Sequence, residues 1–295
     1  MFKFCLVLLA TGFIQSSAAA RGFTCNGSIG NVSTFAAVYF GYDSLNILGK
    51  FNLVVLDPPD YTPEAIARLK SLKCMPFAYV DIGESETYRS DFSLVDTSIL
   101  LAPDPDWQDR YYVDIGSAKW QELILDERIP RILKSGYCGL FLDLSGLLED
   151  YPQMDKSAAA LIERIRKRFP NTRLILDDGL DIVNRVGNLI DGVAVEGLIG
   201  YYDFDSDSYR IRGDLAISRL AMELTSYAKK FRLRIFVLDY AAADDGKTRD
   251  DIIIQSRKFG FAPYVGTVEL DTLFLNTVYK IKLPVERKVV QPADR

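Results

Sequence analysis

Short apolar segments recur along this chain and alternate with stretches that have helical periodicity. The apolar residues within each segment are continuous rather than alternating, so both faces of each predicted strand should be buried, as in a parallel sheet covered by helices. Eight such strands are predicted, at residues 36–40, 52–56, 76–82, 137–142, 173–176, 192–195, 234–238 and 261–265.

Helical signals lie between these strands. Thr62, followed by proline, is a typical helix start, and residues 214–230 and 248–259 are also predicted to be helical. A short additional strand is predicted at residues 111–114. The number and length of these units predict a single (β/α)8 barrel, the TIM barrel, over residues 21–283. An open doubly wound sheet is disfavoured because no glycine-rich nucleotide fingerprint follows the first strand.

Both ends of the chain are predicted to lie outside the barrel. Residues 1–20 combine Lys3, an apolar core and a Ser/Ala-rich end, which is typical of a cleaved secretory signal peptide. A membrane anchor is the alternative, but the apolar segment has only about half of the ~20 residues needed to cross a bilayer. Residues 284–295 form a polar tail. We therefore expect a secreted or periplasmic protein with no membrane association after cleavage.

Three cysteines remain after the predicted cleavage, namely Cys25, Cys74 and Cys138. An oxidising compartment would permit one disulfide among them. Cys74 lies just before one predicted strand and Cys138 at the start of another, so these two could meet at the same end of the sheet. Three buried thiols are the alternative.

The chain contains no histidine among its 295 residues. This absence excludes Ser-His-Asp and Cys-His nucleophile pairs and imidazole metal ligands. Acid–base chemistry must therefore be carried out by Asp, Glu, Tyr, Lys or Cys. The net charge of −5 argues against a nucleic-acid partner, whose binding surface is basic, and suits a neutral or cationic ligand.

Nearly every predicted strand ends in a carboxylate or a tyrosine. In a (β/α)8 barrel the carboxyl ends of the strands form the active-site rim, so these side chains should surround one cleft. Asp143 and Glu196 stand out because each directly follows an apolar run and should lie near the barrel axis. A charge buried there must be paired, bind a metal or take part in function. The other rim residues are predicted to bind substrate, namely Asp57, Asp81, Glu84, Glu86, Tyr88, Arg89, Asp178, Tyr201, Asp239 and Tyr240.

Two carboxyl groups across one cleft are what a glycosidase requires, one as a proton donor and the other as an ionised nucleophile or base. Such an enzyme needs no histidine, metal or cofactor. One competing interpretation is a metal-dependent hydrolase whose clustered carboxylates hold Mg²⁺ or Ca²⁺. Another is a sugar-binding barrel without turnover. The sequence has no EF-hand pattern and no phosphate-binding glycine loop, so no metal or cofactor is predicted.

Three segments resemble glycoside hydrolase family 114. Residues 83–89 (GESETYR) resemble a family hallmark, and residues 112–121 and 139–143 resemble its following segments. The family is typified by secreted endo-α-1,4-polygalactosaminidases with a barrel fold. Their proposed catalytic pair is an Asp at the end of strand 4 and a Glu at the end of strand 6, which the resemblance maps onto Asp143 and Glu196.

Two positions depart from the family pattern. Asp178 stands where members often have Asn, and Gly146 stands where many have a second acid. The resemblance therefore implies a diverged member that hydrolyses an α-1,4-linked, galactosamine-containing polysaccharide. Asp143 would be the nucleophile or base and Glu196 the general acid. An acidic cleft suits a partly deacetylated, cationic polymer, and the protein is expected to be a monomer.

Overall fold

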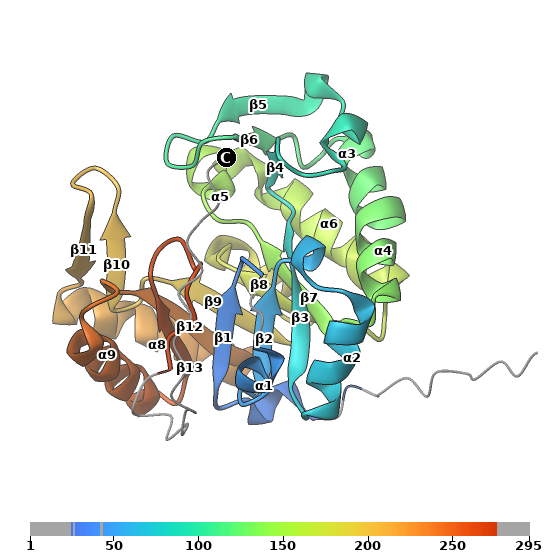
Figure 1. Ribbon diagram of the computed structural model, residues 1–295. Helices are drawn as coiled ribbons and strands as arrows, with labels where there is room; N and C mark the ends of the chain where they lie inside the picture. Colours follow the sequence, from blue (N-terminus) through green and yellow to red (C-terminus); the bar gives the residue numbers. More distant parts are fainter. Residues whose placement is uncertain (1–24, 26, 42–43, 276–295) are drawn as a thin grey trace, which may run out of the picture.

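The central element of the structure is a parallel sheet of eight strands that curls into a nearly closed barrel (Figure 1). The computed structural model describes residues 25, 27–41 and 44–275. The strands in their spatial order are β1 (Phe35–Val38), β2 (Leu53–Leu56), β3 (Met75–Asp81), β7 (Gly139–Asp143), β8 (Arg173–Asp177), β9 (Gly192–Glu196), β12 (Arg234–Tyr240) and β13 (Ala262–Gly266). All eight predicted strands are present, and the (β/α)8 barrel is confirmed.

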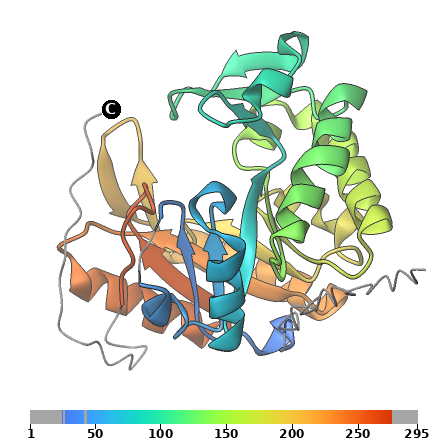
Figure 2. The same ribbon diagram turned by 45° about the vertical axis from the view of Figure 1, so that its right-hand side comes forward.

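Helices cover the outside of this barrel (Figures 1 and 2). They are α1 (Leu45–Leu48), α2 (Pro63–Ser71), α3 (Ala118–Glu122), α4 (Ile129–Lys134), α5 (Leu147–Asp150), α6 (Asp155–Arg168), α7 (Val183–Val186), α8 (Asp214–Phe231) and α9 (Gly246–Lys258). The predicted start of α2 is confirmed, because the Thr62 hydroxyl accepts the N–H of Ala65 at 3.3 Å. In α8 the buried residues recur every three or four positions, so one face packs on the barrel.

Two small antiparallel sheets stand beyond the carboxyl ends of the barrel strands (Figure 1). One contains β4 (Glu84–Glu86), β6 (Arg110–Val113) and β5 (Leu100–Pro103), and the other is the hairpin of β10 (Gly200–Asp203) and β11 (Ser208–Ile211). The strand predicted near residue 111 is β6, which belongs to this small sheet and not to the barrel. The other four strands are only three or four residues long, and the sequence did not indicate them.

The barrel interior is a packed core rather than a pore. The rings of Phe35 and Phe236 meet edge to face at 5.1 Å, and Phe35 also contacts Tyr264 at 6.0 Å, which joins the first and last strands. Gly139 pairs with Phe77 across β7 and β3, and a Cβ at Gly139 would lie 2.4 Å from the Phe77 ring. Because the interior is filled, a substrate must bind at the end of the barrel, where the strands finish.

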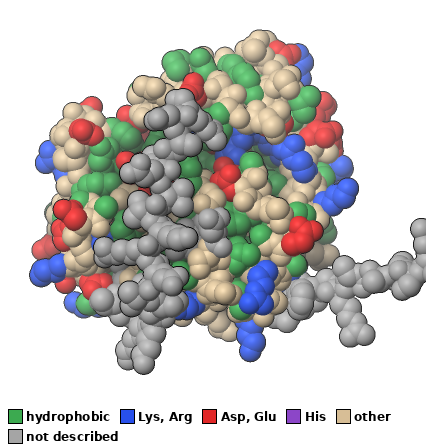
Figure 3. Space-filling model, viewed as in Figure 1, with side chains coloured by type: hydrophobic (Ala, Val, Ile, Leu, Met, Phe, Trp, Pro, Cys, Tyr) green, Lys and Arg blue, Asp and Glu red, His purple; other side chains and the backbone are tan. Residues whose placement is uncertain are grey.

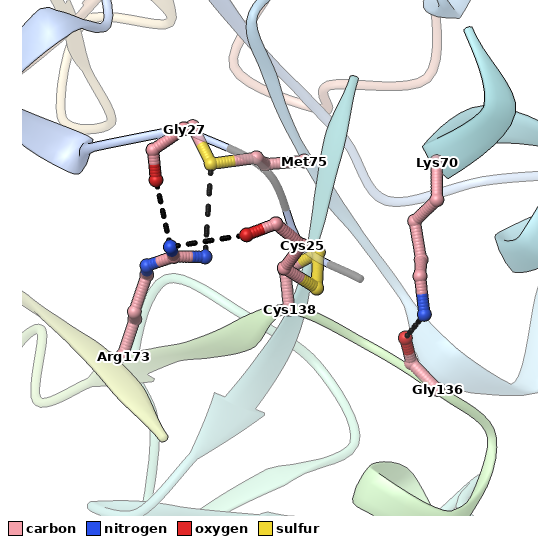
Figure 4. Close-up of a disulfide and its surroundings, with 7 residues drawn as sticks. All are labelled: Cys25, Gly27, Lys70, Met75, Gly136, Cys138 and Arg173. Atoms are coloured by element: carbon pink, nitrogen blue, oxygen red, sulfur yellow. Dashed lines mark hydrogen bonds between the residues drawn. A yellow bond between two sulfur atoms is a disulfide. The ribbon is translucent and has the colours of Figure 1, made fainter. Parts of the chain in front are cut away.

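A disulfide joins Cys25 to Cys138, which are 113 residues apart in sequence (Figure 4). It lies at the amino ends of the strands, where Arg173 donates hydrogen bonds to the carbonyl oxygens of Cys25 and Gly27 at 3.2 and 2.7 Å. Cys74, which could have met Cys138, is instead a buried free thiol. The strand register explains this, because the N–H of Cys138 bonds to Pro76, two residues beyond Cys74.

We expect reduction of this disulfide to lower the free energy of unfolding by about 2–4 kcal/mol, because the bond closes a very long loop. Thermal unfolding with and without reductant measures the effect, at about 2–4 °C per kcal/mol for a protein of this size. A Cys25→Ser/Cys138→Ser variant should melt at the lower temperature under both conditions, whereas Cys74→Ser should keep the response to reductant. An identical melting temperature with and without reductant would contradict the prediction.

Among the described residues, no helix is long and apolar enough to cross a membrane. The predicted signal peptide (1–20) and polar tail (284–295) lie outside the described residues. Both therefore stay predictions.

Candidate active site

The parallel register places several carboxylates on the interior face of the barrel at its carboxyl end. Asp81 pairs with Asp143 across β3 and β7, and Asp143 pairs with Asp177 across β7 and β8. Paired residues in a parallel ladder point to the same side of the sheet. Asp177 in turn pairs with Ala194, and Glu196, two residues further along β9, shares that face. Four strands thus direct a carboxyl group toward one rim.

Asp143 is held by two hydrogen-bond donors. The Tyr79 hydroxyl donates to Asp143 Oδ2 at 2.7 Å, and the backbone N–H of Ser145 donates to Asp143 Oδ1 at 2.8 Å. The side chain is nearly buried, with 7% of its residue surface exposed. Two donors aimed at separate oxygens fix the orientation of this carboxyl group.

Burial dominates the environment of Glu196. Burial raises its pKa to about 8, with a further contribution from the negative charges of Asp178 and Asp143. The Tyr240 hydroxyl donates a hydrogen bond to Glu196 Oε2 at 2.5 Å and acts against this rise. Glu196 therefore carries a proton at neutral pH.

Asp177 is a rim residue that the sequence did not single out. It is fully buried, and neither carboxyl oxygen makes a hydrogen bond of normal geometry within the described residues. Burial, followed by the charges of Glu196 and Asp143, raises its pKa well above the ordinary value. The predicted strand ended one residue too early for its register to be seen. A step of two from Ile175, which pairs with Phe141, would have placed Asp177 beside Asp143.

Asp178 accepts hydrogen bonds from groups next to the two central carboxyl groups, those of Asp143 and Glu196. Its Oδ2 accepts the Ser145 hydroxyl at 3.3 Å, and its Oδ1 accepts the N–H of Glu196 at 3.4 Å. Its backbone adopts a left-handed φ of 51°, which turns the side chain out of the β8 register. Burial raises its pKa to about 7, assisted by Asp143.

Three tyrosines line the same end of the barrel. The rings of Tyr39 and Tyr79 lie 4.4 Å apart, and Tyr240 approaches from β12. Burial raises the pKa of each hydroxyl well above its ordinary value, so all three stay protonated and can donate hydrogen bonds. Of these three tyrosines, only Tyr240 was predicted as a site residue. Tyr39 and Tyr79 lie inside predicted strands and not at their last positions.

Asp81 fixes the turn that leads into β4. Its Oδ1 accepts the backbone N–H groups of Gly83 and Glu84 at 3.0 and 2.7 Å. Burial raises its pKa to about 8, with contributions from Asp143 and Glu86. The turn carries Glu84 away from the barrel strand and onto the small sheet.

Asp57, Glu86, Tyr88 and Arg89 form one ion-paired cluster beside the rim. Arg89 donates to Glu86 Oε1 at 2.8 Å and to Asp57 Oδ1 at 2.5 Å, and the Tyr88 hydroxyl donates to Glu86 Oε1 at 2.6 Å. The cluster ties the end of β2 to β4. Arg89 and Glu86 also line a cavity of about 270 Å³ that extends toward α4. In the space-filling view, acidic and basic side chains lie side by side in this part of the molecule, below the small sheet (Figure 3).

Asp239 does not line the cleft, in contrast to the expectation from sequence. It is fully buried, and its Oδ1 accepts the backbone N–H groups of Ile199 and Gly200 at 2.8 and 3.1 Å. It follows Leu238, the register partner of Glu196, so it points to the other face of β12. Asp239 therefore fixes the loop into β10. Tyr201 lies on the hairpin itself, with the Arg212 guanidinium 4.7 Å from its ring centre.

The described residues contain no group of three or more Cys, Asp or Glu side chains arranged to hold a metal ion. The rim instead pairs its carboxyl groups with tyrosine hydroxyls and backbone N–H groups, as in the Tyr79–Asp143 and Tyr240–Glu196 contacts. This arrangement can hold and release protons.

Known proteins with a similar fold include two solved structures. The glycoside hydrolase domain of PelA from Pseudomonas aeruginosa superposes with a TM-score of 0.74 at 22% identity, covering 82% of this chain and 97% of that chain. Ega3 from Aspergillus fumigatus, solved in complex with galactosamine, superposes with a TM-score of 0.63 at 15% identity, covering 83% and 94%. At these identities the likeness demonstrates the shared barrel fold.

Sequence comparison assigns the family. An uncharacterized protein of Methanocaldococcus jannaschii is 26% identical over 265 residues, covering 77% of this chain and 73% of that protein. Another from Thermotoga maritima is 24% identical over 252 residues, covering 76% and 75%. The sequence pattern of glycoside-hydrolase family GH114 matches residues 16–281. The resemblance inferred from residues 83–89 is thereby confirmed, and the chain belongs to glycoside-hydrolase family GH114.

Proposed function

We propose that this glycosidase cleaves an α-1,4-linked, galactosamine-containing polysaccharide, with Glu196 as the general acid and Asp143 as the nucleophile or base. One observation carries the assignment of roles. The two carboxyl groups share a rim and differ in environment, because burial raises the pKa of Glu196 to about 8 whereas Asp143 accepts a hydrogen bond at each of its two oxygens. A glycosidase needs one protonated carboxyl group as the acid and a second carboxyl group as the nucleophile or base.

The proposed reaction breaks one glycosidic C–O bond. Glu196 gives its proton to the departing oxygen, and the Asp143 carboxylate either attacks the anomeric carbon or removes a proton from the attacking water. Tyr79 keeps Asp143 oriented through its 2.7 Å hydrogen bond. Positive charge develops on the sugar ring in the transition state, and the carboxylates of the rim would stabilise it.

The proposed substrate class rests on charge and on the related structures. Ega3 has been solved with galactosamine bound, and this chain carries a net charge of −5. A net negative charge raises the local concentration of a partly deacetylated, cationic polymer. We therefore propose an amino-sugar polysaccharide as the partner, with no nucleic acid.

We also propose that the protein is secreted or periplasmic and acts as a monomer. The predicted signal peptide at residues 1–20 supports export. The Cys25–Cys138 disulfide supports it independently, since disulfides persist in oxidising compartments.

The proposal is tested by incubating the protein with a partly deacetylated α-1,4-linked galactosamine polymer and measuring new reducing ends. We expect reducing ends to accumulate equally with and without EDTA. Loss of activity in EDTA would favour a metal-dependent hydrolase. Polymer binding without new reducing ends on any amino-sugar polymer would favour a sugar-binding barrel.

The activity should fall as the pH rises through about 8, because Glu196 must be protonated to act as the acid. Replacing Tyr240 by Phe removes the hydroxyl that lowers the pKa of Glu196, so the alkaline limb of the pH–rate profile should move to higher pH. Profiles of kcat/KM against pH measure the shift. Tyr227→Phe on α8 is the matched control and should leave the limb in place, and an unshifted limb in Tyr240→Phe would contradict the prediction.

A further inference from the structure

We propose that Arg110 is a specificity-determining residue, which binds an acceptor oxygen of the substrate and selects an N-acetylated sugar over a cationic amino sugar at the rim. This inference rests on the proposed function, because it concerns the sugar unit that the same rim would bind.

Arg110 lies on the side of the small sheet that faces the rim. It pairs with Glu86 in the antiparallel ladder of β4 and β6, so these two side chains share one face of the sheet. Glu84, two residues from Glu86, lies on that face too, and its Oε2 is 3.8 Å from Arg110 Nη1. The positive charge of Arg110 opposes the rise in pKa that burial causes at Glu196 and Asp81.

The guanidinium of Arg110 has unused N–H donors. It makes no hydrogen bond to any described residue, although its side chain is only 19% exposed. Arg89 and Arg128, by contrast, direct their N–H groups at carboxylate oxygens of Glu86 and Asp91. A largely buried guanidinium has five N–H donors, and leaving them unsatisfied is costly. This unused capacity indicates a ligand that supplies acceptor oxygens.

Packing holds the guanidinium in place for such a ligand. Its centre lies 5.1 Å from the ring centre of Trp107, which follows β5. The neighbouring Glu84 offers little negative charge, because burial, followed by the charges of Asp81 and Asp104, raises its pKa far above the ordinary value. Arg110 therefore presents a positive charge and free donors to whatever binds beside it.

The charge and donors of Arg110 distinguish two forms of the same sugar. A galactosamine unit with a free amine is cationic at neutral pH, and two positive charges repel each other at short range. An N-acetylated unit is neutral, and its carbonyl oxygen can accept a hydrogen bond from the guanidinium. We therefore expect an acetylated unit beside Arg110, with free-amine units bound elsewhere along the acidic cleft.

The test compares two α-1,4-linked galactosamine oligomers of equal length, one fully N-acetylated and one fully deacetylated. In Arg110→Gln, the ratio of kcat/KM for the acetylated over the deacetylated oligomer should fall about 10–100-fold, as expected for loss of a hydrogen bond to a charged group. Arg185→Gln, an exposed arginine paired with Asp155 on α6, should keep the wild-type ratio. Equal losses on both oligomers, or an unchanged ratio, would overturn the proposal.

A binding measurement separates this inference from the proposed function. Calorimetry with Glu196→Gln should show tighter binding of the acetylated oligomer, and adding Arg110→Gln should abolish that preference. Arg110→Lys keeps the charge and should still discriminate against the deacetylated oligomer. If the wild type cleaves neither oligomer, the proposed function fails, but a preference that depends on Arg110 still supports the inference. Equal binding of both oligomers by Glu196→Gln overturns it.

Discussion

Replacing Glu196 by Gln or Asp143 by Asn is expected to lower kcat about 10³-fold or more, while the protein stays folded. Glutamine has the shape of glutamic acid but cannot give a proton to the leaving oxygen, and proton transfer by a positioned side chain contributes about 10²–10⁴-fold to the rate. Asparagine at 143 keeps an acceptor for Tyr79 but loses the negative charge. Reducing-end formation under single-turnover conditions measures both effects.

A substrate with a good leaving group distinguishes the two roles. An aryl glycoside needs little protonation as it departs, so it should restore much of the rate to Glu196→Gln and little to Asp143→Asn. Asp244→Asn is the matched control, since Asp244 is an exposed carboxylate in the loop after β12, at the same end of the barrel. Wild-type rates in either central variant, or rescue of Asp143→Asn alone, would contradict the assignment.

The second large effect concerns stability, which should be greatest at about pH 4–5 and fall as the pH rises toward 8. Burial raises the pKa values of Asp57, Asp178 and Asp239 to about 6, 7 and 7. Between its unfolded and its folded pKa, such a group keeps a proton in the folded protein and loses it in the unfolded chain. Stability is therefore fully present below the unfolded pKa and is lost as the pH rises through the folded pKa.

The size of this effect follows from the shifts. The rise of Asp239 from 3.8 to about 7 corresponds to about 4 kcal/mol, at about 1.4 kcal/mol per unit. The opposite trend applies to Asp91, because its ion pairs with Arg128 and Arg131 together outweigh burial and hold its pKa below the ordinary value. Its contribution is lost when the pH falls through its folded pKa, which sets the acid side of the optimum.

Asp177→Asn provides the sharpest test of this pH dependence. The amide is neutral at every pH and has nearly the same shape as the protonated carboxyl group. The free energy of unfolding of the variant should exceed that of the wild type by a margin that grows about 1.4 kcal/mol per pH unit from about pH 5 upward, until the pH reaches the folded pKa of Asp177. Denaturant titrations at several pH values measure this margin, and Asp244→Asn should show none. A constant difference across this range would mean that Asp177 is ionised in the folded protein.

The barrel was predictable because its signals are local. Continuous apolar runs, such as those at residues 139–142 and 192–195, reflect strands buried on both faces, and the eight strands predicted from them all became barrel strands. β10 and β11 were missed because they are partly exposed and pair only with each other. Their stability comes from contacts such as that of Tyr202 with Tyr209, which no local pattern reveals.

The disulfide shows a similar limit. The sequence indicated that one disulfide could form, but not its partners. Cys25 meets Cys138 only because the segment before β1 crosses beneath the sheet, where Arg173 holds it. Such long-range placement depends on the assembled barrel, so spacing along the chain could not reveal it.

Sequence alone determined the barrel, the rim to which its strand ends deliver carboxylates, and the need for carboxyl chemistry in a chain without histidine. Tertiary structure decided which of those carboxylates face one another. Successive side chains of a strand point to opposite faces, so a shift of one residue would move Asp177 from its place beside Asp143 to the other face of the sheet. The same alternation puts Asp239 on the face of β12 opposite to the one that Leu238 shares with Glu196. Burial then determined which of these groups are charged. Glu196 keeps its proton because it is buried and because Asp143 on β7 and Asp178, which follows β8, lie nearby.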